Sequence, residues 1–124
     1  MPIDLEVDDT AGLIRFRIDG DVTTAEMLRA LRDARLRAER GRRYVVLSDH
    51  RAIGQPIAPD QLRTVIAEIS HPEAPWRGSD VAVVVGQQAS YGMMRALAVH
   101  AERFGIRVGV FWEEAEARRF LELP

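Results

Sequence analysis

The sequence predicts an α/β domain built on a mixed, mostly parallel five-stranded sheet with about four helices. Three short apolar runs rich in β-branched residues, at positions 44–47, 81–85 and 108–111, are each followed by a segment of helical period. Buried strands that alternate with helices are typical of a parallel sheet covered on both faces. Two N-terminal segments of alternating polarity add a hairpin, so the expected order is β-β-α-β-α-β-α-β-α.

The hairpin is expected from residues 3–7 and 13–18, which both alternate apolar and polar side chains. Residues 8–12, Asp-Asp-Thr-Ala-Gly, have the composition of a turn. Arg15 and Arg17 fall on the polar side of the second segment. The alternation therefore predicts an edge of the sheet with one solvated face, where charges discourage pairing with another chain.

The first helix is expected to begin after Thr23, because Thr23 and Glu26 have the spacing of a capping box. Gly41 is expected to end this helix. Its apolar positions form a one-sided stripe at Met27, Leu28, Leu31, Ala34 and Ala38.

The bounds of the remaining elements are predicted from proline, glycine and charged residues at their ends. The third strand is expected to end at Leu47, with a loop over residues 48–58 and Pro59 in the first turn of the second helix. The third helix is expected to start near Ser90 and to stop at Gly105. A short final helix is expected over residues 113–121, opened by acidic residues that suit a helix N-terminus.

Composition narrows the class of protein. We expect one domain over residues 1–124 in the cytoplasm, because the chain has no cysteine, no signal-like N-terminus and no apolar run of membrane-spanning length. The net charge of −2 indicates no general affinity for nucleic acid.

All 17 basic residues are arginine. Seven of them gather on and just after the first helix, where they form either a solvated helix face or a contact for an acidic partner, anionic lipid or nucleic acid: Arg29, Arg32, Arg35, Arg37, Arg40, Arg42 and Arg43.

Several stretches resemble the STAS domain, the fold of anti-sigma-factor antagonists, and most closely its SpoIIAA-like branch. The likeness is carried by residues 16–20 leading into Thr23, by residues 45–49, and by the segments at 81–86, 91–93, 108–111 and 115–121. The resemblance implies a SpoIIAA-like sheet and a regulatory binding module. It also implies a phosphorylatable serine at the start of the second helix, but residues 57–61 read Ile-Ala-Pro-Asp-Gln and offer only the charge of Asp60. We therefore expect partner binding that is constitutive or controlled by a ligand, without a serine phosphoswitch.

Ligands of open α/β sheets bind beyond the carboxyl ends of the strands. The candidate ligand-binding residues there are Asp49, His50, Arg51, Gln87, Ser90, Tyr91 and Trp112. Asp49 and His50 have acid–base chemistry and Arg51 suits an anion, although neighbours on a strand point to opposite sides. In the alternative interpretation, Asp49 caps a turn, His50 is solvated and Ser90 is a helix N-cap. The loop at 86–92 lacks the spacing of known phosphate-binding motifs.

Apolar residues in predicted loops form a second group of candidates. Ile53, Ile57 and Trp76 either fold back on the core or line an apolar pocket or a dimer contact. Ile57, Asp60 and Trp76 are the candidate partner-binding residues. The three histidines, His50, His71 and His100, have no metal-ligand spacing, so neither a metal nor a cofactor is expected.

The sequence thus predicts a non-enzymatic binding module that recognises a protein partner or a small ligand, with surfaces that suit a homodimer. Nucleic-acid binding and membrane insertion are not expected. One alternative is a carrier of a lipid or another small apolar or anionic molecule, which requires an apolar cavity near Ile53, Ile57, Trp76 and Trp112. Another is an enzyme that uses Asp49, His50 and Tyr91, which requires these side chains to converge.

Overall fold

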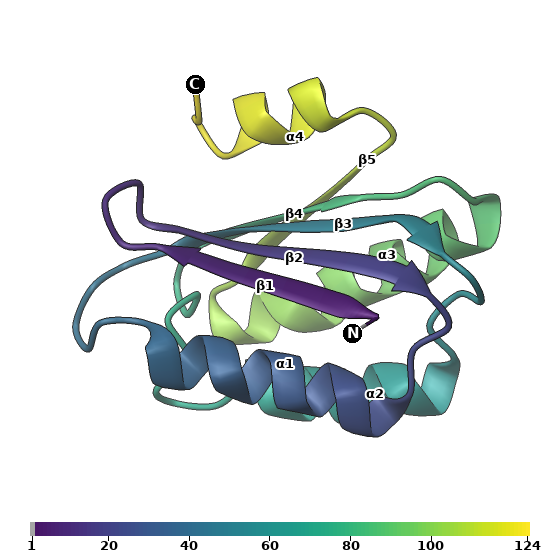
Figure 1. Cartoon of the computed structure of the whole chain (residues 1–124), viewed down its shortest axis with the longest axis horizontal. Helices are drawn as coiled ribbons and strands as arrows, with labels where there is room; N and C mark the ends of the chain where they lie inside the picture. Colours follow the sequence, from purple (N-terminus) through teal and green to yellow (C-terminus); the bar gives the residue numbers. More distant parts are fainter. Residues whose placement is uncertain (1) are drawn as a thin grey trace.

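The computed structural model describes residues 2–124 and has one five-stranded sheet with the strand order β1-β2-β3-β4-β5 (Figure 1). β1 pairs antiparallel with β2, and the other neighbours pair in parallel. The strands are β1 (Ile3–Asp8), β2 (Leu13–Gly20), β3 (Val45–Ile53), β4 (Asp80–Val84) and β5 (Arg107–Phe111). The helices are α1 (Thr24–Arg37), α2 (Pro59–Ile69), α3 (Gln88–Ala101), the 3-10 helix η1 (Glu102–Phe104) and α4 (Glu114–Phe120). The predicted fold class and element order are confirmed.

The helices are divided unequally between the two faces of the sheet. α1, α2 and α3 lie on one face, and α4 lies alone on the other (Figure 1). The strands from β2 to β5 lie side by side in chain order, so each parallel connection steps to the next strand in the same direction. Because such connections are right-handed, their helices all cover the same face of the sheet. The expectation of helices on both faces therefore holds only through α4.

The N-terminal hairpin is confirmed, and its register explains its alternation. Leu5 pairs with Phe16 and Val7 with Ile14, so apolar side chains of both strands face the three helices. Charged side chains share the opposite face, where Glu6 lies across from Arg15. Opposite charges at cross-strand positions stabilise a solvated sheet face.

Helix boundaries agree with the predicted signals at the start of α1, at Pro59 in the first turn of α2, at Gly105 after η1 and for α4, and they differ at the end of α1 and the start of α3. The Thr23–Glu26 capping box is present, but α1 ends at Arg37 with Ala38 as its C-cap, several residues before Gly41. α3 begins at Gln88 with Gln87 as its N-cap. Ser90 is therefore a buried residue of the first turn and not the N-cap.

The third strand is longer than predicted, since β3 continues to Ile53. Residues 48–51 read Ser-Asp-His-Arg, a polar run that resembles a loop in the sequence. These residues stay in the sheet because their polar groups find partners within the fold, as described below.

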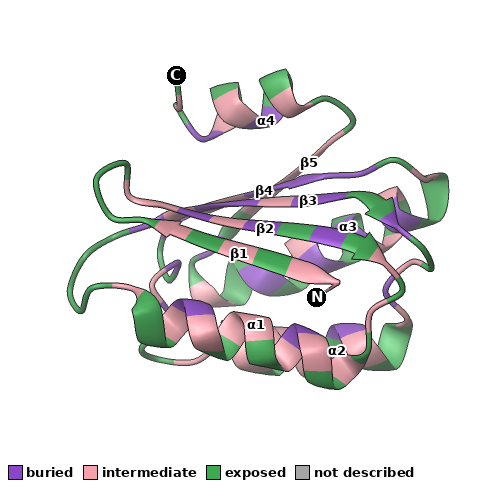
Figure 2. Ribbon diagram, in the orientation of Figure 1, coloured by how far each residue is buried: buried purple, intermediate pink, exposed green. Residues whose placement is uncertain are grey.

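The core has two parts, one on each face of the sheet. Most buried residues lie between the sheet and the three helices, where two adjacent clusters meet (Figure 2). A smaller cluster under α4 contains Leu47, Ala82, Val84, Ala117 and Leu121. Among residues 2–124, no helix has the length and apolarity needed to cross a membrane.

Candidate functional site

The central candidate residues lie on β3, beside a β-bulge. Arg17 pairs with Asp49 whereas Asp19 pairs with Ala52, so β3 has one more residue than β2 at this point. Asp49 lies on the face that carries α4, and His50 lies on the face that carries the other three helices. The expectation that these neighbours do not face one another is met. Bulges bend a strand and redirect its side chains, and they are common beside functional sites.

His50 is buried, with 6% of its surface exposed, so the interpretation of a solvated histidine is wrong. Its Nε2 atom lies 2.8 Å from Oγ of Ser48, two residues earlier on the same side of β3. Burial lowers the pKa of His50 to about 4, against a weaker opposing effect of Asp49. The imidazole is therefore neutral at pH 7, with one nitrogen protonated and the other able to accept a hydrogen bond.

His50 and Ser48 line a cavity between the sheet and the three helices. The cavity has a volume of about 100 Å³, and almost all of its other lining is apolar. Representative lining residues from β2, the α2 region, β4 and α3 are Phe16, Ile57, Leu62, Trp76, Val83 and Met94. Protein interiors rarely keep voids much larger than a water molecule, so a cavity of this size is a distinctive feature of the core.

Trp76 and Ile57 form part of this cavity wall and not of the molecular surface. Trp76 is 2% exposed, and its indole Nε1–H donates to the carbonyl of Ile69 over 3.0 Å. Ile57 is 6% exposed and packs in the same cluster as Ile53. Their proposed role as surface contacts for a partner is corrected, because loops around α2 turn these side chains inward. The pocket alternative matches the position of Ile57 and Trp76, but neither Ile53 nor Trp112 lines the cavity.

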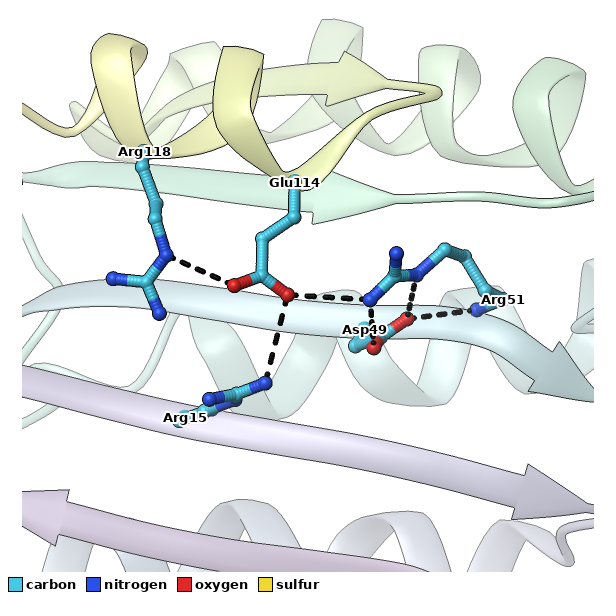
Figure 3. A network of polar contacts seen from close by, with 5 residues as sticks. All are labelled: Arg15, Asp49, Arg51, Glu114 and Arg118. Atoms are coloured by element: carbon cyan, nitrogen blue, oxygen red, sulfur yellow. Dashed lines mark hydrogen bonds and ion pairs between the residues drawn. The ribbon is translucent and has the colours of Figure 1, made fainter.

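On the other face of the sheet, Asp49 belongs to a network of ion pairs (Figure 3). Its carboxylate accepts from the backbone N–H of Arg51 over 3.0 Å and from the Arg51 guanidinium over 3.0 and 2.8 Å. The hydrogen bonds from the Arg51 side chain hold the pKa of Asp49 below its usual value despite partial burial. Asp49 therefore anchors the bulge and does not cap a turn.

Glu114 connects this network to α4. Its carboxylate contacts Arg51 at 3.2 Å, Arg15 at 3.6 Å and Arg118 at 2.9 Å (Figure 3). The hydrogen bond from Arg118 is the main reason that the pKa of Glu114 is lowered. The network joins β2, β3 and α4, and within it the Arg51 guanidinium contacts two carboxylates, those of Asp49 and Glu114.

The remaining candidates lie at the carboxyl ends of the strands. Tyr91, at the start of α3, stacks on Trp112, with ring centroids 5.4 Å apart and planes at 10°. Trp112 remains 42% exposed. The Gln87 side chain donates to the carbonyls of Ile53 and Gly54 over 3.0 and 3.4 Å, which ties the end of β3 to the start of α3.

Ser90 and Asp60 take up unlike positions at the starts of two helices. Oγ of Ser90 is buried and has no hydrogen-bond partner within the described chain. Asp60 is exposed in the first turn of α2.

The proposed catalytic set does not come together. Asp49 is bound to Arg51, His50 to Ser48, and Tyr91 is stacked on Trp112, with no hydrogen bond joining the three within residues 2–124. The same part of the chain contains no cluster of three or more His, Cys, Asp or Glu side chains that could hold a metal ion.

Sequence analysis missed Ser48 as the partner of His50. The signal was the spacing of Val46, Ser48 and His50, which share one side of an extended strand.

Comparisons with known proteins support the fold. No protein-family profile and no curated protein matches the chain. One similar solved structure is that of an uncharacterised DUF3478-family protein from Shewanella loihica PV-4, described as having a SpoIIAA-like fold. It aligns with 96% of this chain and 91% of its own, with a TM-score of 0.64 and 14% sequence identity. The chain therefore has a SpoIIAA-like fold.

Proposed function

We propose that this protein is a non-enzymatic binding module that takes a small, largely apolar ligand into the cavity between its sheet and its three helices. The observation that carries the proposal is the cavity itself, with Ser48 and His50 as its polar groups. Of the functions considered from the sequence, this one corresponds to the carrier of a small molecule. Fold alone does not determine function, so the argument rests on the chemistry of this site.

The energetics of the core favour a ligand at this position. At roughly 24 cal/mol per Å³, a cavity of about 100 Å³ costs about 2 kcal/mol of stability relative to a filled core. Domains of this size are stable by only about 5–15 kcal/mol, so this cost is a substantial fraction of the total. A ligand that fills the cavity recovers this free energy as dispersion contacts and apolar burial.

The lining defines the chemistry of the ligand. A cavity of roughly 150 Å³ accommodates benzene, so this one suits an apolar body of about four heavy atoms. His50 is neutral, and its Nδ1 atom has no hydrogen-bond partner among the described residues. We therefore expect one hydroxyl or carbonyl group on the ligand, placed to bond the imidazole, and no net charge at that end, because an ion buried there would lack a counter-charge.

Two measurements test the proposal. Native mass spectrometry of freshly purified protein reports any retained ligand, and 1-butanol serves as a defined probe in a titration followed by ¹H–¹⁵N NMR. We expect butanol to shift the amides of cavity-lining helix residues such as Leu62 and Leu97, and to leave the amides of α4 around Ala117, on the other face of the sheet, unchanged. A Val83→Ile variant fills part of the cavity and should weaken the response, whereas Val84→Ile on the opposite face should not. Equal shifts on both faces, or none up to the solubility limit, would contradict the proposal.

A further inference from the structure

A second hollow lies outside the cavity, between the end of α1 and the loop that connects α2 to β4. It has a volume of about 760 Å³ and is lined by residues from 35–43 and from 72–78. Five arginines are among its lining residues, and we call it the arginine groove: Arg35, Arg40, Arg42, Arg43 and Arg77. Its volume falls in the range of small-molecule sites.

The two walls of the arginine groove are held in place by the core. The backbone N–H of Tyr44 donates to the carbonyl of Pro75 over 3.2 Å, which joins the wall that follows α1 to the loop before β4. The Tyr44 hydroxyl accepts from the N–H of Glu39 over 3.0 Å. Ala74, in the facing wall, is buried beside Trp76 in the same core cluster. The groove is thus a preformed recess, which reduces the ordering cost of binding.

Three of the five arginines already have carboxylate partners. Arg35 lies 3.4 Å from Glu68, Arg40 lies 3.2 Å from Glu73, and Arg42 lies 3.4 Å from Glu39. The last two pairs are exposed, and such pairs contribute little to stability. These partners account for the charge of three guanidinium groups and leave two without an ion pair.

Arg43 and Arg77 are those two. Arg43 donates to the carbonyl of Gly78, and Arg77 donates to the carbonyl of Ser70 over 3.1 Å. Neither forms an ion pair with any carboxylate of residues 2–124. The neighbouring Asp80 is held by Arg107 through contacts of 3.0 and 2.8 Å. Arg43 acts on the Asp80 carboxyl only at longer range, as a weaker cause of its lowered pKa than Arg107. Arg77 bonds the C-cap residue of α2, where a helix end carries a partial negative charge. Neither arginine is therefore neutralised by a direct ion pair.

Stabilisation of the C-terminal end of α1 does not explain the positions of these two arginines. Basic side chains in the last turn of a helix stabilise its negative end, and Arg35 and Arg37 occupy that turn. Arg43 lies beyond the helix, and Arg77 belongs to the opposite wall of the groove. Their shared location indicates a site with two positive charges in one recess.

We infer that the arginine groove binds a small molecule bearing a diphosphate or several phosphate groups. Guanidinium groups bind phosphate oxygens through paired, charge-assisted hydrogen bonds, which makes arginine a preferred ligand for this group. Two guanidinium groups without an ion pair match the charge of a dianion. The recessed shape favours a soluble phosphorylated molecule over a flat membrane surface. This site is separate from the apolar cavity, so the inference stands or fails independently of the proposed function.

The test is an NMR titration of the full chain with inorganic pyrophosphate at constant ionic strength. We expect saturable shifts of amides in 39–43 and 74–79, and a dissociation constant at least about tenfold weaker for Arg43→Gln/Arg77→Gln. The matched control is Arg63→Gln/Arg95→Gln, which removes the same charge from two exposed arginines outside the groove and should change the affinity less than about twofold. If the first double variant loses its dispersed spectrum, the single variant Arg77→Gln replaces it with the same expected direction.

Three outcomes would overturn the inference. One is the absence of shifts up to 10 mM pyrophosphate, taken here as roughly the upper limit for a specific site. Another is equal weakening by both double variants, which would indicate only general charge attraction. The third is binding to phosphatidic acid vesicles in a sedimentation assay without any response to pyrophosphate, which would assign the groove to a membrane surface instead of a soluble ligand.

Discussion

Adding one methylene group at Val83 should stabilise the protein, whereas the same change at Val84 should destabilise it. These neighbours on β4 are both buried but point to opposite faces of the sheet. Val83 lines the cavity of about 100 Å³. Val84 packs in the cluster under α4 with Ala82 and Ala117 and does not line the cavity.

The magnitudes follow from the space available. Burying one additional methylene contributes about 0.8 kcal/mol, and filling the whole cavity could recover no more than about 2 kcal/mol, so we expect Val83→Ile to gain about 1 kcal/mol. For a chain of this length that corresponds to a rise in melting temperature of roughly 3–6 °C. At Val84 the extra methylene has no space, and overpacking typically costs about 1–3 kcal/mol.

Urea denaturation of the two variants measures these changes directly. The midpoint should rise for Val83→Ile and fall for Val84→Ile, with the dependence on urea concentration unchanged in both. Because the two substitutions are chemically identical and adjacent, they control for β propensity and for effects on the unfolded chain. Equal destabilisation by the two variants would refute the argument that the Val83 side of the sheet has unfilled volume.

Three further predictions concern other parts of the fold. Because burial lowers the pKa of His50 to about 4 from its ordinary 6.5, the unfolded chain binds a proton first as the pH falls. Stability should therefore decrease between pH 6.5 and 4, by at most about 3 kcal/mol, and His50→Gln should flatten that part of the pH profile in urea melts. Glu114→Gln, which removes the carboxylate shared by three arginines, should cost about 0.5–1 kcal/mol at low salt and less at 1 M salt, and an effect independent of salt would argue against the ion-pair network. Gly109→Ala places a methyl group 2.6 Å from the ring of Phe111 and 3.1 Å from that of Phe120, so it should lower stability by about 1–3 kcal/mol, and an unchanged melting temperature would show that both rings move freely.

The sequence predicted the elements best where the pattern is local. The Thr23–Glu26 capping box, the alternation of the N-terminal hairpin and the apolar runs of β4 and β5 each depend on residues a few positions apart. Such spacing reports which side chains share a face, because the helical and extended periods are fixed by backbone geometry. These elements appear within one or two residues of their expected positions.

The errors lie where distant residues decide the outcome. The polar run at 48–51 resembles a loop in the sequence, but its first residues, Ser48 and Asp49, pair with β2 on one side and with β4 on the other, so this part of the chain stays in the sheet. Ser90 has a typical N-cap side chain, but the helix begins earlier and turns it inward. Trp76 lies in an irregular segment that folds back on the core, as the orientation of the indole toward the carbonyl of Ile69 shows.

The order of strands and helices, and with it the SpoIIAA-like fold class, was determined by the sequence itself, because apolar periodicity and capping act over a few residues. Only the tertiary structure decided that three helices share one face, that β3 continues through a bulge after Asp49, and that a cavity remains between the sheet and those helices. It also decided that Arg43 and Arg77 line one groove and that neither forms an ion pair with a carboxylate of residues 2–124. A cavity volume and an unmatched charge are differences between contributions from many separate segments, and no single stretch of sequence contains them.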